Sequence, residues 1–300
     1  MHFTPGRVWP AMFTPLDESG AVNLDAIDRL VELFVEQQLG GLFVAGSTGQ
    51  GVLLSPEERR HVAQCAVRAA AGRIPIMVHV GSTRTDEAIS LARHAAEIGA
   101  DAVSSVPPIY YPLDAKTALA HYHKIGKATD LPFFPYHAFF LHQALPAAKD
   151  YAQRLLEIPN IAGMKFTDRD LYLMEVIHAH SGGRLKILSG ADELMCHAAL
   201  SGAVGAIGTF YNLWGPACQR VRQAFVAGEF ERARQFMITF ARVIDEILSA
   251  GSMWSFHRAS MRLKYDIDIG PPRAPLGLAE REWPPADVER LVSEVDAAAE

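Results

Sequence analysis

Cysteines, basic clusters and long apolar stretches are scarce in this 300-residue sequence. Its three cysteines, Cys65, Cys196 and Cys218, lie far apart and form no CxxC pair. This spacing argues against a disulfide framework or a cysteine-based zinc site, and free thiols are typical of a reducing compartment. The net charge is −6, and no basic stripe is present that would neutralise phosphates. The charge pattern therefore argues against nucleic-acid binding.

Membrane and export signals are also missing from the sequence. No apolar stretch reaches the roughly 18 residues that a membrane span requires. Residues 1–5 have neither the basic nor the apolar region of a signal peptide, so we expect none. We therefore expect a soluble, cytoplasmic protein that binds neither membranes nor nucleic acid.

Short apolar runs alternate regularly with helical patterns along the chain. Strands are predicted at residues 8–13, 41–45, 74–80, 102–106, 132–136, 161–166, 185–188 and 203–209. Helices are predicted at residues 24–38, 86–98, 116–128, 146–156, 171–180, 192–200 and 216–227, and another begins after Ser55. In that helix Ser55 can cap the first turn, and Glu58 completes a capping box.

Eight strand–helix units, with no dinucleotide fingerprint after the first strand, favour an α/β fold in which parallel strands close into a (β/α)8 TIM barrel. We expect this barrel to occupy residues 1–228. Residues 229–300 are predicted to form a C-terminal helical appendage packed on the barrel, because no linker rich in Gly, Ser and Pro separates the two parts.

Lys165 is the residue that says most about function. It is one of only seven lysines and lies in the apolar run 161–166. Such a lysine either extends to solvent or holds its amine where water solvates it poorly. Residue type alone favours the solvated alternative, because buried lysines are rare. In the other case the amine loses its proton more readily and can attack a carbonyl carbon.

Polar residues follow several of the predicted strands, and chemistry in such a barrel takes place at the carboxyl ends of the strands. The candidates are Ser47, Thr48, Tyr110, Tyr111, Tyr136, Lys165, Asp192, Glu193 and Thr209. The sequence GSTGQG at residues 46–51 places two hydroxyls between glycines, where backbone N–H groups and hydroxyls could hold a carboxylate. An ordinary turn is the alternative for that segment.

Several of these motifs together resemble a known family. They are GSTGQG at 46–51 with LSPEER at 54–59, PPIYYP at 107–112, Tyr136, GMK at 163–165 and GAVGAIG at 202–208. Their order and spacing are similar to those of the pyruvate-dependent class I aldolases, the N-acetylneuraminate lyase and dihydrodipicolinate synthase group. Within this group the chain looks most like the N-acetylneuraminate lyases, because of KFTDRDL at 165–171, GADE at 190–193 and GTFYN at 208–212. GPPRAPL at 270–276 is also similar, but no chemistry follows from it.

The resemblance implies the catalytic roles. Lys165 would form an imine with the ketone of pyruvate, so that no metal or other cofactor is needed. Tyr136 would move the proton of the aldehyde-derived hydroxyl, and Ser47 would relay protons or orient Tyr136. Thr48 would hold the pyruvate carboxylate. Tyr110 would reach into the site of a neighbouring subunit, which implies a homo-tetramer built as a dimer of dimers.

The resemblance also implies a subsite for the rest of the substrate, lined by Gly190, Asp192, Glu193, Gly208 and Thr209. The acidic pair is expected at the mouth of the barrel, where carboxylates can accept hydrogen bonds from a polyol chain.

Three departures from the family pattern affect the choice of substrate. Gln50 stands where the family usually has Glu, and Ala191 replaces a bulkier residue. The segment from Tyr136 to His142 lacks the usual Tyr-x-x-Pro pattern. Leu141 stands where dihydrodipicolinate synthases carry an Arg, which weighs against that activity.

The favoured function is cleavage of N-acetylneuraminate or a related 2-keto-3-deoxy sugar acid to pyruvate and an aldehyde. The alternatives are a dihydrodipicolinate synthase or sugar-acid dehydratase on the same scaffold, and a non-catalytic keto-acid-binding protein. Neither a metal site nor a nucleotide site is expected. Within each of the two His-x-His pairs, the two histidines point to opposite sides of a helix and cannot share a metal ion well. The glycine-rich GAVGAIG does not have the GxGxxG spacing of a nucleotide-binding loop.

Overall fold

The computed structural model describes residues 7–110, 114–138 and 147–300. Eight parallel strands lie in the order β1-β8-β7-β6-β5-β4-β3-β2. Their bounds are β1 Val8–Pro10, β2 Leu42–Val44, β3 Ile76–His79, β4 Ala102–Ser105, β5 Phe133–Ala138, β6 Gly163–Thr167, β7 Lys186–Ser189 and β8 Gly205–Gly208. A parallel bridge between Ala11 and Phe43 joins the β1 end to β2 and completes the ring. The predicted (β/α)8 barrel is confirmed.

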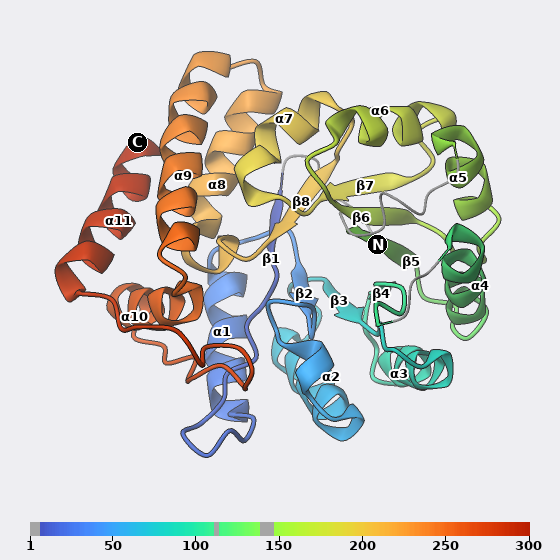
Figure 1. Cartoon of the computed structure of the whole chain (residues 1–300), viewed down its shortest axis with the longest axis horizontal. Coiled ribbons are helices and arrows are strands. Elements are labelled where there is room, and N and C mark those ends of the chain that lie inside the picture. The colour runs from blue at the N-terminus through green and yellow to red at the C-terminus, as the bar shows by residue number, and fades with distance from the viewer. Residues whose placement is uncertain (1–6, 111–113, 139–146) are drawn as a thin grey trace.

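Helices surround the strands on the outside (Figure 1). Those that follow the strands are α1 Leu24–Glu36, α2 Pro56–Ala70, α3 Thr85–Glu97, α4 Ala115–Gly126, α5 Ala148–Leu155, α6 Leu171–His180, α7 Met195–Leu200 and α8 Tyr211–Val226. Short 3-10 turns, Gly51–Leu53 and Asp192–Leu194, precede α2 and α7. The predicted capping box opens α2, with Ser55 N donating to Glu58 Oε2 at 2.7 Å and Glu58 N donating to Ser55 Oγ at 3.2 Å.

The eighth helix differs from the prediction of a helix over 216–227. It begins earlier, at Tyr211, and kinks at Trp214, whose φ and ψ are −117° and 22°. Pro216 explains the difference, because proline suits the first turn after a break but cannot donate a backbone hydrogen bond inside a helix. The chain directly after β8 therefore forms one helical turn before the kink.

Three further helices follow the barrel: α9 Phe230–Ser249, α10 Met253–Tyr265 and α11 Pro285–Ala298. They lie beside α8 on one side of the barrel (Figure 1). The boundary at residue 228 between barrel and appendage stays a prediction. Within the described ranges, no helix has the length and apolar character that would let it cross a membrane.

Two apolar cores result from the alternation of side chains along the strands. One fills the space between strands and helices. The other lies inside the barrel and consists of Trp9, Ala11, Phe43, Met77, Ala102, Phe134, Tyr136, Ala138, Leu188 and Ile207. Tyr136 pairs in register with Lys165, and Lys165 pairs with Leu188. Residues in register on parallel neighbours point to the same side, so Lys165 faces the barrel interior.

Candidate active site

Lys165 is buried between two aromatic rings. Only 5% of the residue is exposed. Its Nζ lies 4.2 Å from the centre of the Tyr136 ring and 4.4 Å from the centre of the Phe43 ring. The solvated alternative is therefore wrong for this lysine, which lies in the middle of β6 with its amine inside the barrel.

The Tyr136 phenol lies beside this amine and interacts with it by hydrogen bonding and by charge. Burial alone would raise the pKa of Tyr136. The positive charge of Lys165 and hydrogen bonding from Thr167, Lys165 and Ser47 outweigh burial, so the pKa of Tyr136 is lowered from its ordinary value. A phenol with a lowered pKa is better suited to take up and return a proton near neutral pH.

The loop after β2 is tied to the loop after β8 by a pair of hydroxyls. Thr48 Oγ1 and Thr209 Oγ1 lie 2.7 Å apart, and Thr48 is buried. Ser47 belongs to the same loop as Thr48 and lines a cavity of about 290 Å³ together with Tyr136. The predicted hydroxyl residues are thus brought to the mouth of the barrel.

Asp192 and Glu193 lie in two different environments. We expected both carboxylates to accept hydrogen bonds at the mouth of the barrel. Glu193 lines a cavity of about 480 Å³. Asp192 is only 5% exposed, and its Oδ2 accepts a 2.7 Å hydrogen bond from Phe210 N. Burial raises the pKa of Asp192 to about 7. A Cβ on Gly208 would overlap Asp192 Oδ1, so glycine at 208 is what allows this packing.

Two of the cavities formed by the described residues lie at this end of the barrel. The larger one, of about 480 Å³, is lined by Thr167, Asp168, Arg169, Gly190, Ala191 and Glu193. The smaller one, of about 290 Å³, is lined by Ser47, Gln50, Val52, Leu53, His79, Val106, Ile109, Tyr136, Ala138, Pro275 and Leu276. The first lies over the ends of β6 and β7, and the second lies over the ends of β2 to β5.

Tyr110 stands apart from this cluster. It is 78% exposed at the end of the described part of the loop after β4, and the neighbouring Ile109 lines the smaller cavity. Tyr111 and Leu141 lie outside the described residues, as does the rest of the unusual segment from residue 139 onward. His137 belongs to the described part of that segment. It is fully buried, stacks on Phe166 with ring centres 4.6 Å apart and lies 3.4 Å from Asp168 Oδ2.

Sequence reasoning missed four residues that line or shape the site: Phe43, His79, Thr167 and Asp168. A signal existed for two of them. Thr167 is two residues after Lys165 and so faces the same side of β6. His79 is the next-to-last residue of the strand predicted at 74–80, close to the strand end where the other candidates were sought. Phe43 had no such signal, because a buried aromatic residue on a strand is usually part of the core.

The sequence predicts no metal site, from the spacing of its cysteines and of its His-x-His pairs. Among the residues that the structure describes, no group of three or more His, Cys, Asp or Glu side chains is arranged to hold a metal ion. The three cysteines are free and buried.

Comparison with known proteins agrees with this geometry. Residues 4–294 match the dihydrodipicolinate synthetase family. The chain is 33% identical to N-acetylneuraminate lyase of Rattus norvegicus over 283 residues, which cover 91% of this chain and 87% of the rat protein. It is also 33% identical to N-acetylneuraminate lyase of Rhizobium meliloti (strain 1021) over 246 residues, which cover 82% of this chain and 81% of that protein.

A solved structure has the same fold over nearly the whole length. N-acetylneuraminate lyase (sialic acid aldolase) from Aliivibrio salmonicida superposes with a TM-score of 0.86 at 26% identity, covering 99% of this chain and 98% of that chain. With the family match and the barrel agreeing from end to end, the chain belongs to the dihydrodipicolinate synthetase family.

Proposed function

We propose that the protein is a Schiff-base class I aldolase that cleaves N-acetylneuraminate, or a related 2-keto-3-deoxy sugar acid, reversibly to pyruvate and an aldehyde. The observation that carries the proposal is the buried Lys165 amine beside Tyr136, in a chain whose curated relatives are N-acetylneuraminate lyases. The enzyme is a lyase that acts on a small molecule.

Lys165 supplies the covalent chemistry. Its neutral amine attacks the C2 ketone of the substrate, and uptake of one proton with loss of water leaves an iminium. Breaking the C3–C4 bond leaves an electron pair on C3, which moves into the iminium and gives an enamine. The enamine takes a proton at C3, and water releases pyruvate and the free amine. The imine is the electron sink, so we propose that no cofactor takes part.

Tyr136 and Ser47 move the proton. When the C3–C4 bond breaks, the C4 hydroxyl must lose its proton to become the aldehyde, and a Tyr136 phenolate can accept it. The lowered pKa of Tyr136 makes this phenolate accessible. Ser47 contributes to that lowering and lies in the same cavity, so it is placed to relay the proton or to orient the phenol.

The remaining predicted residues hold the substrate. We propose that Thr48 binds the pyruvate carboxylate, and that Thr209, through its hydroxyl bond to Thr48, keeps this group in place. The larger cavity provides room for the polyol chain, with Glu193 and Gly190 in its lining. Asp192 and Gly208 are packed against each other at the end of β8, and we propose that Asp192 meets the chain from that side.

The assembly and location are also proposals. We propose a homo-tetramer. Tyr110, which is exposed in the single chain, reaches into the active site of a neighbouring subunit and completes that site. We propose a cytoplasmic enzyme that binds neither nucleic acid nor membranes, because its net charge is −6 and no basic stripe is present.

The test of substrate choice is the ratio of kcat/KM for two aldehydes, each condensed with saturating pyruvate. A site built to hydrogen-bond hydroxyls rejects an analogue that lacks them by as much as about 10⁴-fold, because its polar groups are left unpaired. We expect N-acetylmannosamine to react far better than aspartate semialdehyde. A preference for aspartate semialdehyde would replace the lyase proposal with the synthase alternative.

A further inference from the structure

His79 is a buried residue at the centre of the site for which the proposed reaction has no use. It is the last residue of β3, is 3% exposed and lines the smaller cavity with Ser47 and Tyr136. Its ring meets the Tyr136 ring nearly edge-on, with centres 6.3 Å apart and planes at 82°. It also contacts the Phe43 ring, with centres 5.9 Å apart. His79 therefore packs against both aromatic rings that flank Lys165.

The two ring nitrogens of His79 bond to two different loops. Nδ1 lies 3.2 Å from Ala45 O, and Nε2 lies 3.2 Å from Val106 N. A carbonyl oxygen only accepts and a backbone amide only donates, so Nδ1 must carry the proton and Nε2 must be free of one. The geometry thus requires a neutral imidazole of one tautomer. Burial, together with the charges of Arg59 and Lys165, lowers the pKa of His79 well below its ordinary value, which agrees.

Each of these bonds holds a backbone segment that leads to a predicted catalytic residue. Ala45 has a φ of 57°, a left-handed conformation that is unfavourable for a residue other than glycine. It comes two residues before Ser47, so the bond from His79 stabilises the turn that places Ser47. Val106 opens the loop that carries Tyr110. A Cβ on Gly81 would lie 2.8 Å from His79 Nε2 and 2.9 Å from Val106 N, so glycine at 81 leaves room for this bond.

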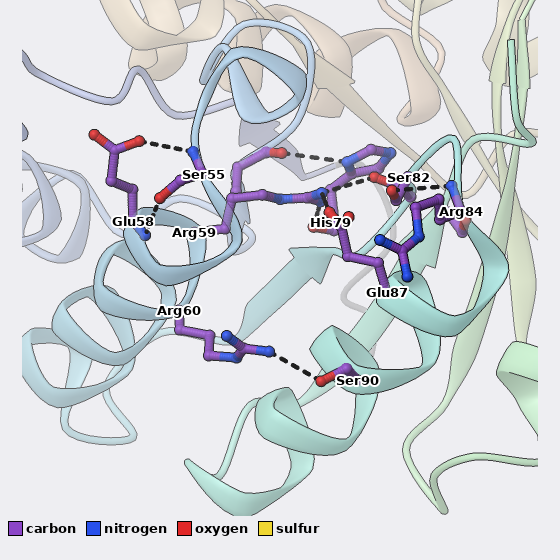
Figure 2. Close-up of polar contacts among 12 residues, drawn as sticks. Ser55, Glu58, Arg59, Arg60, His79, Ser82, Arg84, Glu87 and Ser90 are labelled. Atoms are coloured by element: carbon purple, nitrogen blue, oxygen red, sulfur yellow. Dashed lines mark hydrogen bonds and ion pairs between the residues drawn. The ribbon is translucent and has the colours of Figure 1, made fainter. Parts of the chain in front are cut away.

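A buried arginine fixes the backbone from which the His79 ring extends. Arg59 reaches from α2 to the end of β3, with Glu87 near its guanidinium (Figure 2). Arg59 Nη2 donates to His79 O at 2.8 Å, and Arg59 Nη1 donates to Gly81 O at 2.9 Å. Arg59 is 3% exposed and lies 3.9 Å from Glu87 Oε1, so its charge is paired inside the protein. The imidazole therefore sits on an anchored strand end.

We propose that His79 is a positioning residue, whose neutral imidazole holds the Ser47 loop and the Tyr110 loop at a fixed separation beside Tyr136. This inference rests on the proposed aldolase function and adds a residue to it. His79 does not touch the reacting atoms. It acts through Ala45 and Val106, and it sets where the Ser47 hydroxyl meets the Tyr136 phenol.

The experiment compares two substitutions of His79 with a matched control. His79→Phe keeps an aromatic ring and removes both hydrogen bonds. His79→Asn retains a donor near the Nδ1 position, within reach of Ala45 O. His121→Phe is the control, because His121 is equally buried and also has two partners, Thr85 Oγ1 at 3.0 Å and Ser105 Oγ at 3.4 Å, but lines neither cavity.

Two activities are measured on each full-length variant. One is trapping of pyruvate by borohydride, which needs Lys165 and the carboxylate site at Thr48 but not the proton relay of Tyr136 and Ser47. The other is the kcat and KM of N-acetylneuraminate cleavage, which also needs the proton relay. For His79→Phe we expect near-normal trapping and KM but a kcat lowered by about 100-fold, the effect of a displacement near 1 Å. We expect the kcat of His79→Asn to be about tenfold higher than that of His79→Phe. We expect His121→Phe to keep the wild-type kcat.

An equal fall in kcat for His79→Phe and His121→Phe would overturn the inference, as would a His79→Phe variant that loses trapping and cleavage in parallel. If His79→Phe does not fold, His79→Asn decides, and the inference fails if its kcat is no better than that of a Ser47→Ala variant. Wild-type protein that traps no pyruvate and cleaves nothing would instead overturn the proposed function, and the inference with it.

Discussion

The ion pair between Glu58 and Arg273 joins two distant parts of the chain at the edge of the site. Arg273 Nη1 and Nη2 each donate to one Glu58 oxygen at 2.8 Å. The same guanidinium donates to Leu53 O and Gly20 O, and Arg273 N donates to Gln50 Oε1 at 2.6 Å. Pro275 and Leu276, which follow Arg273, wall the smaller cavity. We therefore predict that Glu58→Gln loosens this wall and destabilises the fold.

The size of the effect follows from the Glu58 carboxylate. Hydrogen bonding from Arg273 lowers the pKa of Glu58 from 4.5 to about 2. At about 1.4 kcal/mol per pKa unit this corresponds to roughly 3 kcal/mol, and partial exposure to solvent reduces it to about 2 kcal/mol. The two side chains are 29% and 25% exposed. Because the folded-state pKa is lowered, the stabilisation is complete above about pH 4.5 and is lost as the pH falls through about 2.

The assay is urea denaturation of wild type and Glu58→Gln at pH 7, 5 and 3 and one protein concentration. We expect a difference in the free energy of unfolding of about 2 kcal/mol at pH 7 that shrinks at pH 3. Glu231→Gln is the control, because the pKa of Glu231 is also lowered to about 2, by Arg234, but both side chains are mostly exposed. Equal effects of the two substitutions, or a difference that does not change with pH, would contradict this prediction.

Three other substitutions test the site and the assembly. Tyr110→Phe should lower kcat without unfolding the protein, and sedimentation at assay concentration should show a tetramer; a fully active monomer would contradict this. Gly208→Ala should displace the Asp192 carboxylate, so the KM for N-acetylneuraminate should rise while the yield of trapped pyruvate changes less. If both change by the same factor, Asp192 does not bind the sugar part of the substrate. Thr209→Val should raise the KM for pyruvate in the condensation direction by leaving Thr48 without its hydroxyl partner, and an unchanged KM would count against carboxylate binding at Thr48.

The barrel was predictable because its signals are local. Each strand is a short apolar run, and the capping box of Ser55 and Glu58 marks the start of α2 within four residues. Strand ends then place candidate side chains at one mouth, since the carboxyl ends of parallel strands in a barrel lie together. Ser47 and Tyr136 line one cavity at this mouth in the structure, and Glu193 lines the other.

The contacts that set the chemistry were not predictable in the same way. Asp192 and Glu193 are consecutive, and their sequence does not show that one is buried against Phe210 N while the other lines a cavity. The sequence alone predicts that Glu58 caps the start of α2. Its second partner, Arg273, lies 215 residues away, and only the folded chain brings them together.

The role of His79 could not be predicted from the sequence either. A histidine at the end of an apolar strand is usually a core residue, and its pattern does not reveal which partners its nitrogens have. The left-handed Ala45 and the amide of Val106 give the ring its proposed role, and neither is visible in the sequence.

Imine formation at Lys165 is the central claim, and trapping with borohydride tests it most directly. The protein is incubated with pyruvate, reduced, digested and analysed by mass spectrometry. We predict one reduced pyruvate adduct per chain on the peptide that contains Lys165, and none in Lys165→Ala. An adduct on Lys186 or Lys264, or an adduct that persists in Lys165→Ala, would contradict the account.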